Sequence, residues 1–222
     1  MKPTPLSIAA AVAVVITYIR VIFFTPLEAI QGPAQKILYI HAPAAWVAFM
    51  AFALVALAGA LYLWLREDRL DRIAESSAEV GVVFTTVVLT TGPLWGKPIW
   101  GAYWTWDARL TLTLFLWFIY VAYLVMRGAL EDRAVRARYS AVLGILGALL
   151  IPFIHLSVYL FRTLHPQPIL MKPSAPSMPG EMLTTLLIAF ASFTLLYVAL
   201  LRARYRYAVA RDDAHPPESY VA

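Results

Sequence analysis

Histidines and a dense group of tryptophans are the residues of this sequence whose types could carry chemistry. His41 and His165 stand far apart along the chain, each among apolar residues. Four of the seven tryptophans fall within 12 residues: Trp95, Trp100, Trp104 and Trp106. Neutral imidazole is the commonest protein ligand of metals, and indole rings offer a flat apolar surface. This combination is typical of a site for a large planar ligand that contains a metal.

The tryptophan-rich segment also has an ordinary explanation, because Trp and Tyr gather wherever helices leave a membrane. Such a belt needs one or two aromatic residues at a helix end, whereas this segment holds four tryptophans together with Tyr103. Gly96, Pro98 and Gly101 disfavour a single straight helix through the segment. We therefore predict a short stretch that lies along the membrane surface and forms an aromatic platform for a ligand.

The four histidines are not equivalent. His215 lies in a polar tail, and His155 lies within an apolar span after Pro152, where contact with a neighbouring helix is its ordinary role. His41 and His165 both flank apolar spans at the level predicted for the tryptophans. Two imidazoles at this level could hold a haem iron from both sides. Zinc is disfavoured, because further ligands at suitable spacing are not evident.

A haem also carries carboxylates, and arginine pairs well with carboxylates. The cations predicted on this face are Arg20, Lys36, Lys97, Arg109 and Arg162. Each could instead anchor a helix at the membrane edge, so the pairing is left open. Asp107 is predicted to cap the helix that follows it, to orient Arg109 or an indole N–H, or to do both. The chain has no cysteine, so the predicted ligand is non-covalent haem b.

The elements that position these residues are predicted to be membrane helices. Of the 222 residues, 61% are apolar and 14% charged, whereas soluble domains are about 45–50% apolar and about 25% charged. A helix that crosses a bilayer needs about 20 apolar residues. We predict an all-α polytopic membrane protein with six transmembrane helices, at about 6–24, within 37–65, and at about 77–94, 110–126, 139–161 and 182–201.

The distribution of basic residues predicts the orientation of these helices. Of the 18 Lys and Arg residues, 12 lie in the two tails and in the second and fourth connections. Basic residues favour the cytoplasmic side, so both termini are predicted in the cytoplasm and the tryptophan-rich third connection outside. The net charge of +5 is then explained by basic loops, and no nucleic-acid partner is expected. We expect one membrane domain over residues 1–205 and a cytoplasmic tail over 206–222.

The tryptophan-rich segment resembles the WWD signature of haem-handling proteins, through Trp95-Gly96-x-x-x-Trp100-Gly101-x-x-Trp104-x-Trp106-Asp107. Within that group, the chain from Tyr39 to the sixth span resembles the haem exporter protein C family (CcmC) of bacterial cytochrome c maturation system I. Further matching runs are Tyr39-Ile40-His41-Ala42-Pro43, Asp107-Ala108-Arg109 and Thr163-Leu164-His165.

The resemblance implies that His41 and His165 are paired histidines that contact haem, and that the motif tryptophans and Asp107 form the platform. It implies a multi-pass protein of the bacterial inner membrane with its haem site facing the periplasm. It further implies delivery of haem to a periplasmic haem chaperone for c-type cytochrome biogenesis. The implied complex contains the ATPase and membrane subunits of an ABC transporter and a small single-span subunit.

Other functions are left open by the sequence. A cytochrome b-type electron-transfer subunit would need paired histidines inside the bundle, and the third, fourth and sixth spans contain none. A permease subunit that moves haem would show ionisable or broken elements near mid-membrane, for which Glu79 and Pro152 are weak indications. The sequence has no P-loop, so we expect no enzymatic activity of the chain itself.

Overall fold

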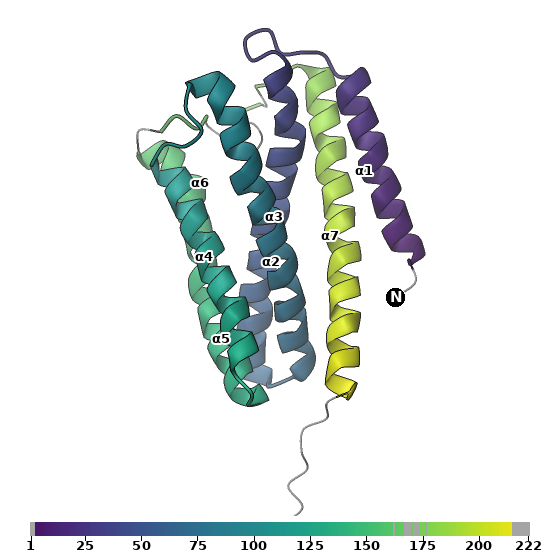
Figure 1. Cartoon of the computed structure of the whole chain (residues 1–222), viewed down its shortest axis with the longest axis vertical. Coiled ribbons are helices and arrows are strands. Elements are labelled where there is room, and N and C mark those ends of the chain that lie inside the picture. The colour runs from purple at the N-terminus through teal and green to yellow at the C-terminus, as the bar shows by residue number, and fades with distance from the viewer. Residues whose placement is uncertain (1–2, 162, 167–169, 171–173, 176, 215–222) are drawn as a thin grey trace, which may run out of the picture.

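The computed structural model is a bundle of long helices (Figure 1). It describes residues 3–161, 163–166, 170, 174–175 and 177–214. The helices are α1 (Pro5–Phe23), the short 3-10 helix η1 (Pro33–Ile37), α2 (Leu38–Leu65), α3 (Asp68–Trp100), α4 (Ala108–Ala129), α5 (Arg133–Ala148), α6 (Leu150–Leu160) and α7 (Gly180–Ala214). Within the described residues, six helical spans are long and apolar enough to cross a bilayer. The chain is thus a multi-pass membrane protein, which confirms the predicted all-α fold with six spans.

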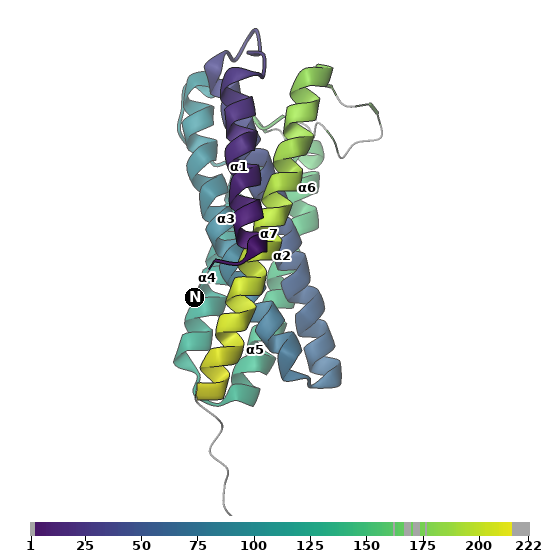
Figure 2. The same cartoon turned by 90° about the vertical axis from the view of Figure 1, so that its right-hand side faces the viewer.

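Helix α2 packs against α3, α5 and α7. Helix α1 lies along α7 at one edge of the bundle in Figure 1, and in front of the other helices in Figure 2. Small residues allow the close packing around α2. At Gly81 of α3, an added Cβ would come within 2.5 Å of the ring of Phe52. The Phe52 ring in turn stacks on Tyr120, with ring centroids 3.6 Å apart. Helices α2, α3 and α4 are therefore held in one tight core.

Helix α3 is longer than the predicted third span. It continues through Gly96 and Pro98 to Trp100, so the expected break does not occur and Trp95 and Trp100 lie on its last turns. A proline removes one backbone donor, and membrane helices tolerate this loss better than soluble ones do. Gly101 ends the helix in the left-handed conformation, with φ of 77°. Only the second half of the tryptophan-rich segment is a connection between helices.

The predicted fifth span consists of two helices, α5 and α6, which meet at Leu149. Pro152 has no N–H to donate to the carbonyl of Ala148 four residues earlier, which accounts for the interruption. Helix α6 ends at Leu160, and the coil that follows it carries His165. The interruption thus lies on the helix that leads into the candidate site.

Charged side chains join α3, α4 and α7 at the opposite end of the bundle. Arg127 donates to Asp71 at 2.6 and 2.9 Å and to Glu75 at 3.1 Å, and its side chain is only 3% exposed. Arg211 donates to Glu75 at 2.7 and 2.9 Å. Helix α7 therefore continues well past residue 205 as part of the packed bundle, and the proposed division of the chain at that residue stays a prediction.

Candidate ligand-binding site

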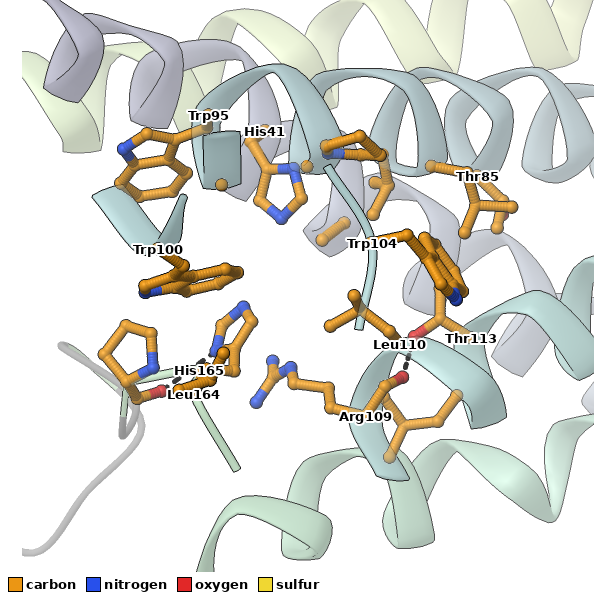
Figure 3. Close-up of a pocket in the computed structure, with 18 of the residues that line it drawn as sticks. His41, Thr85, Trp95, Trp100, Trp104, Arg109, Leu110, Thr113, Leu164 and His165 are labelled. Carbon is orange, nitrogen blue, oxygen red and sulfur yellow. Dashed lines mark hydrogen bonds between the residues drawn. The ribbon is translucent and has the colours of Figure 1, made fainter. Parts of the chain in front are cut away.

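The two histidines singled out in the sequence lie close to each other in the structure. His41 belongs to the first turn of α2, and His165 belongs to the coil after α6. Their ring centroids are 6.5 Å apart and their planes are inclined by 35°. Figure 3 shows the rings on opposite sides of one cavity, with Trp100 on one flank and Arg109 extending toward His165. The fold therefore brings these two distant residues together.

The proton on the His41 ring is assigned by its hydrogen bond to Thr91. His41 Nδ1 lies 3.0 Å from the hydroxyl of Thr91. That hydroxyl already donates its single proton to the carbonyl of Val87, at 2.7 Å. It must therefore accept from the Nδ1–H of His41, which leaves the lone pair of the ring on Nε2.

His165 reaches the same tautomer through the backbone. Its Nδ1 lies 3.0 Å from the carbonyl oxygen of Pro166, which can only accept a hydrogen bond. Burial, followed by the nearby cation of Arg109, lowers the pKa of His165 to about 4. The ring is therefore neutral at physiological pH, with its lone pair on Nε2. Metal-binding histidines are usually held in this way, by donation from the other ring nitrogen.

Three of the four motif tryptophans line the cavity, which has a volume of about 200 Å³. Trp95 meets the His41 ring edge-on, with centroids 5.8 Å apart, and Trp100 lies 6.4 Å from the His165 ring. Trp104 closes another side, and its buried indole N–H has no hydrogen-bond partner in the part of the chain that the structure describes. Deeper in the bundle the wall is mostly apolar.

The remaining two aromatic residues of the predicted platform lie outside the cavity. Trp106 is 76% exposed and contacts the edge of Trp104, with ring centroids 5.7 Å apart. Tyr103 is 59% exposed, and the ammonium of Lys97 lies 5.3 Å from its ring centroid. These rings form an exposed rim next to the cavity and are not part of its wall.

The structure separates the candidate cations. Arg109 lines the cavity, and its Nη1 is buried without a hydrogen-bond partner among the described residues. The others that can be placed are engaged elsewhere: Arg20 donates to Thr185, Lys36 to the carbonyls of Val21 and Ile22, and Lys97 to the carbonyl of Gly101. Arg162 lies outside the described residues. Arg109 is therefore the cation that the structure brings to the two histidines.

Asp107 has a structural role at the edge of the site. Its Oδ1 accepts the N–H of Leu110 at 3.0 Å, which confirms the predicted N-cap of α4. Its Oδ2 accepts the hydroxyl proton of Thr163 at 2.9 Å. Neither bond involves Arg109 or an indole N–H. The carboxylate joins the start of α4 to the coil that carries His165.

His155 does not belong to the cavity. It lies half-buried on α6, with its ring 6.4 Å from the ring of Tyr159. The cavity wall near it is formed instead by Ile154. His155 therefore serves as an internal comparison for the two facing histidines.

The separation of the facing rings suits one metal between them. Bonds between first-row metals and imidazole nitrogen are about 2.0–2.1 Å long, so two trans imidazoles have centroids roughly 6 Å apart. The observed distance is 6.5 Å. Among the residues that the structure describes, no cluster of three or more His, Cys, Asp or Glu side chains could complete a metal site. The pair thus suits a metal whose remaining ligands come from the bound molecule itself.

Comparison with known proteins identifies the family. The family model for "Heme exporter protein C" matches residues 2–219, which is nearly the whole chain. The chain belongs to the heme exporter protein C family.

Several curated relatives carry the same family name. Heme exporter protein C of Haemophilus influenzae is 37% identical over 196 residues, covering 87% of this chain and 79% of the relative. Heme exporter protein C of Bradyrhizobium diazoefficiens is 38% identical, covering 82% and 69%. A putative cytochrome c biosynthesis ccmC-like mitochondrial protein of Marchantia polymorpha is 35% identical, covering 79% and 74%. These matches confirm the resemblance seen in the tryptophan-rich motif.

Three residues of this heme exporter protein C family member have supporting roles at the site that are not evident from the sequence. Thr91 fixes the tautomer of His41, Gln31 accepts the indole proton of Trp95 at 3.0 Å, and Thr163 joins Asp107 to the His165 coil. All three are common polar residues whose role depends on contacts across the bundle. Thr163 alone carried a signal, as part of a run shared with the family.

Proposed function

We propose that this protein binds non-covalent haem between His41 and His165 and delivers it for the biogenesis of c-type cytochromes. One observation carries the proposal: two imidazoles from separate elements face each other at 6.5 Å, each with Nδ1 hydrogen-bonded. Both Nε2 lone pairs are then free for the two axial positions of a haem iron. The names of the relatives, heme exporter protein C, support haem as the cargo.

The walls of the cavity support a flat, partly apolar ligand with carboxylates. Trp95, Trp100 and Trp104 provide aromatic surface beside the histidines. Nη1 of Arg109 and the indole N–H of Trp104 are both buried donors without hydrogen-bond partners among the described residues. Unpaired buried donors are costly, and a bound carboxylate would satisfy them. We assign Arg109, which extends toward His165 (Figure 3), to a propionate of the haem.

The size of the cavity suits a ligand that is passed on and not permanently enclosed. Cavities for small molecules usually measure about 300–1,000 Å³, and this one measures about 200 Å³. An edge of a haem seated between the histidines would therefore extend beyond the cavity. Trp106 and Tyr103, which are exposed beside it, offer contact surface to an acceptor protein. A periplasmic haem chaperone is the acceptor that we propose.

The position of the cavity in the bundle fits delivery on the outer face of the bacterial inner membrane. The aromatic wall of the cavity is formed by the start of α2 and the last turns of α3, whereas the charged cluster lies near the start of α3. Figure 1 shows these two ends of α3 at opposite ends of the bundle. The distribution of basic residues predicts that the cluster faces the cytoplasm. The chain has no nucleotide-binding motif, so we propose that it works with the ATPase and membrane subunits of an ABC transporter and a small single-span subunit.

The test is the absorption spectrum of the purified protein with haem, in wild type and in His41→Ala and His165→Ala. We expect both substitutions to shift the Soret band, weaken haem retention and abolish transfer to the chaperone, because each removes one axial ligand. His155→Ala is the matched control, since it removes a histidine of the same bundle that lies outside the cavity. Spectra and transfer that are unchanged in both His41→Ala and His165→Ala would disprove the proposal.

A further inference from the structure

The coil that carries His165 is held by side-chain hydrogen bonds and not by a helix. Thr163 donates its hydroxyl proton to Asp107 Oδ2 at 2.9 Å. The same hydroxyl oxygen lies 3.1 Å from the backbone N–H of His165. A carboxylate can only accept, and a hydroxyl has a single proton, so the directions of both bonds follow. Thr163 donates to Asp107 and accepts from His165.

The far end of this chain of hydrogen bonds is fixed in the bundle. Asp107 is the N-cap of α4, and its other oxygen accepts the N–H of Leu110 at 3.0 Å. The carboxylate of Asp107 therefore fixes the start of α4 and also the position of the coil after α6 relative to it. The bond from Thr163 has a charged acceptor, and such bonds are roughly twice as strong as neutral ones.

We propose that Thr163 is a positioning residue that holds His165 at its ligating distance from His41 by joining the His165 backbone to Asp107. Thr163 does not line the cavity, so it acts on the haem only through His165. The inference rests on the proposed function and assigns a mechanical role to the hydroxyl within it. Trp100 and Arg109 lie beside the His165 ring. Among the described residues, the backbone N–H of His165 donates to Thr163 and to neither of these two side chains.

The test replaces the hydroxyl while keeping the shape of the side chain. Thr163→Val removes both hydrogen bonds, and Thr163→Ser keeps them. Loss of a bond to a charged group corresponds to about a tenfold or larger change in an equilibrium. We expect Thr163→Val to retain haem about tenfold less well and to convert part of the iron from two-histidine to one-histidine ligation, measured by electron paramagnetic resonance. Thr163→Ser should behave as wild type.

Thr105→Val is the matched control for a change of threonine at the edge of the site. Thr105 lies in the same connection as Asp107, and its buried hydroxyl has no hydrogen-bond partner among the described residues. Its removal should change neither the iron signal nor haem retention. Equal unfolding temperatures of Thr163→Val, Thr163→Ser and Thr105→Val would show that Thr163→Val acts on the position of His165 and not on the stability of the whole fold.

A second measurement uses the protein without haem. The N–H of His165 loses its acceptor in Thr163→Val, so its hydrogen exchange should become faster, while in Thr163→Ser it should stay slow. Unchanged exchange and unchanged ligation in Thr163→Val would overturn the role of Thr163. Failure of the proposed function is recognised separately, because His41→Ala and His165→Ala would then have the same absorption spectrum with haem as the wild type.

Discussion

At the scale of single residues, the site is defined by what holds the two imidazole rings as much as by the rings themselves. Each Nδ1–H is committed to an oxygen, Thr91 Oγ1 for His41 and the Pro166 carbonyl for His165. The tautomers are therefore set before any ligand arrives. Substitution of groups that orient a metal ligand typically weakens metal binding by about 10–100-fold.

The first prediction concerns the bond that orients His41. Thr91→Val should weaken haem binding by about tenfold, because the ring loses its acceptor and the proton is no longer directed to Nδ1. Titration of the purified variant with haem measures the effect. Thr90→Val is the control, since Thr90 donates only to the carbonyl of Thr86 on the same helix. Equal affinities of the two variants would contradict the assigned tautomer.

The second prediction concerns the pH dependence of haem binding. Burial and the Arg109 cation lower the pKa of His165 to about 4, below the ordinary value of 6.5. A lowered histidine pKa keeps the ring unprotonated to lower pH, so His165 should stay able to ligate down to about pH 4 and lose this ability below it. In Arg109→Gln the loss of the cation raises the pKa of His165, and the midpoint of haem loss should move to higher pH. An identical midpoint in Arg109→Gln would show that the cation does not act on His165.

The chemistry of the site could be predicted from residue types, but its supports could not. His41, His165 and the tryptophans stand out because they are rare and clustered in a membrane sequence. Thr91 and Gln31 are ordinary polar residues, and their partners lie on other elements. No local sequence pattern distinguishes a threonine that hydrogen-bonds only to a carbonyl of its own helix from one that also accepts a hydrogen bond from a histidine on another helix.

At the scale of helices, the last turns of α3 form one wall of the site because small residues leave room for its rings. Gly92 of α3 lies directly against His41, and an added Cβ would come within 3.3 Å of His41 Cε1. Gly96 has the same relation to Trp100, at 3.0 Å. The helix thus approaches the site more closely than a helix with side chains at these positions could.

The third prediction uses this close approach. Gly92→Val should displace the His41 ring and reduce haem binding at least tenfold, because the branched side chain would overlap the ring. The readout is haem titration together with the Soret position. Gly128→Val is the control on α4, where an added Cβ would meet nothing within 4 Å. Retained haem binding in Gly92→Val would show that the ring can move aside at no cost to the site.

Helix positions could be predicted from the sequence better than helix ends. Long apolar runs define the six spans, because bilayer thickness sets the length of a crossing helix. The end of α3 differs from the prediction, because Gly96 and Pro98 are tolerated inside it. Glycine and proline are more frequent in membrane helices than in soluble ones, so in this setting they mark a boundary less reliably.

At the scale of the whole molecule, the two ends of the bundle are built differently. One end carries the aromatic cavity, and the other carries ion pairs that join α3, α4 and α7. Glu79, which hinted at a transport path in the sequence, is paired with Arg204 of α7. The ion pairs thus fix the long helix α3 at the end away from the aromatic cavity.

The fourth prediction separates stability from haem binding. Arg127→Met should lower the free energy of unfolding by about 3–5 kcal/mol, because it leaves Asp71 without its buried partner and Glu75 with one partner fewer. Thermal unfolding in detergent measures the loss. The Soret band should be unchanged at temperatures where the variant is folded, since the cluster does not touch the cavity. A shifted Soret band would instead indicate that the two ends are coupled.

The two facing histidines, His41 and His165, lie on elements of unequal rigidity. His41 is part of a helix turn flanked by Tyr39, which is fully buried, and Pro43, which is also buried. His165 sits on coil after the end of α6. Moving His165 away requires the hydrogen bonds of Thr163 to break and a few backbone torsions to rotate, whereas moving His41 away requires a helix turn to unwind from a packed interior. The two rings therefore separate with the smaller free-energy cost when His165 moves. An acceptor protein that approaches from the His165 side would meet the histidine that is displaced more easily.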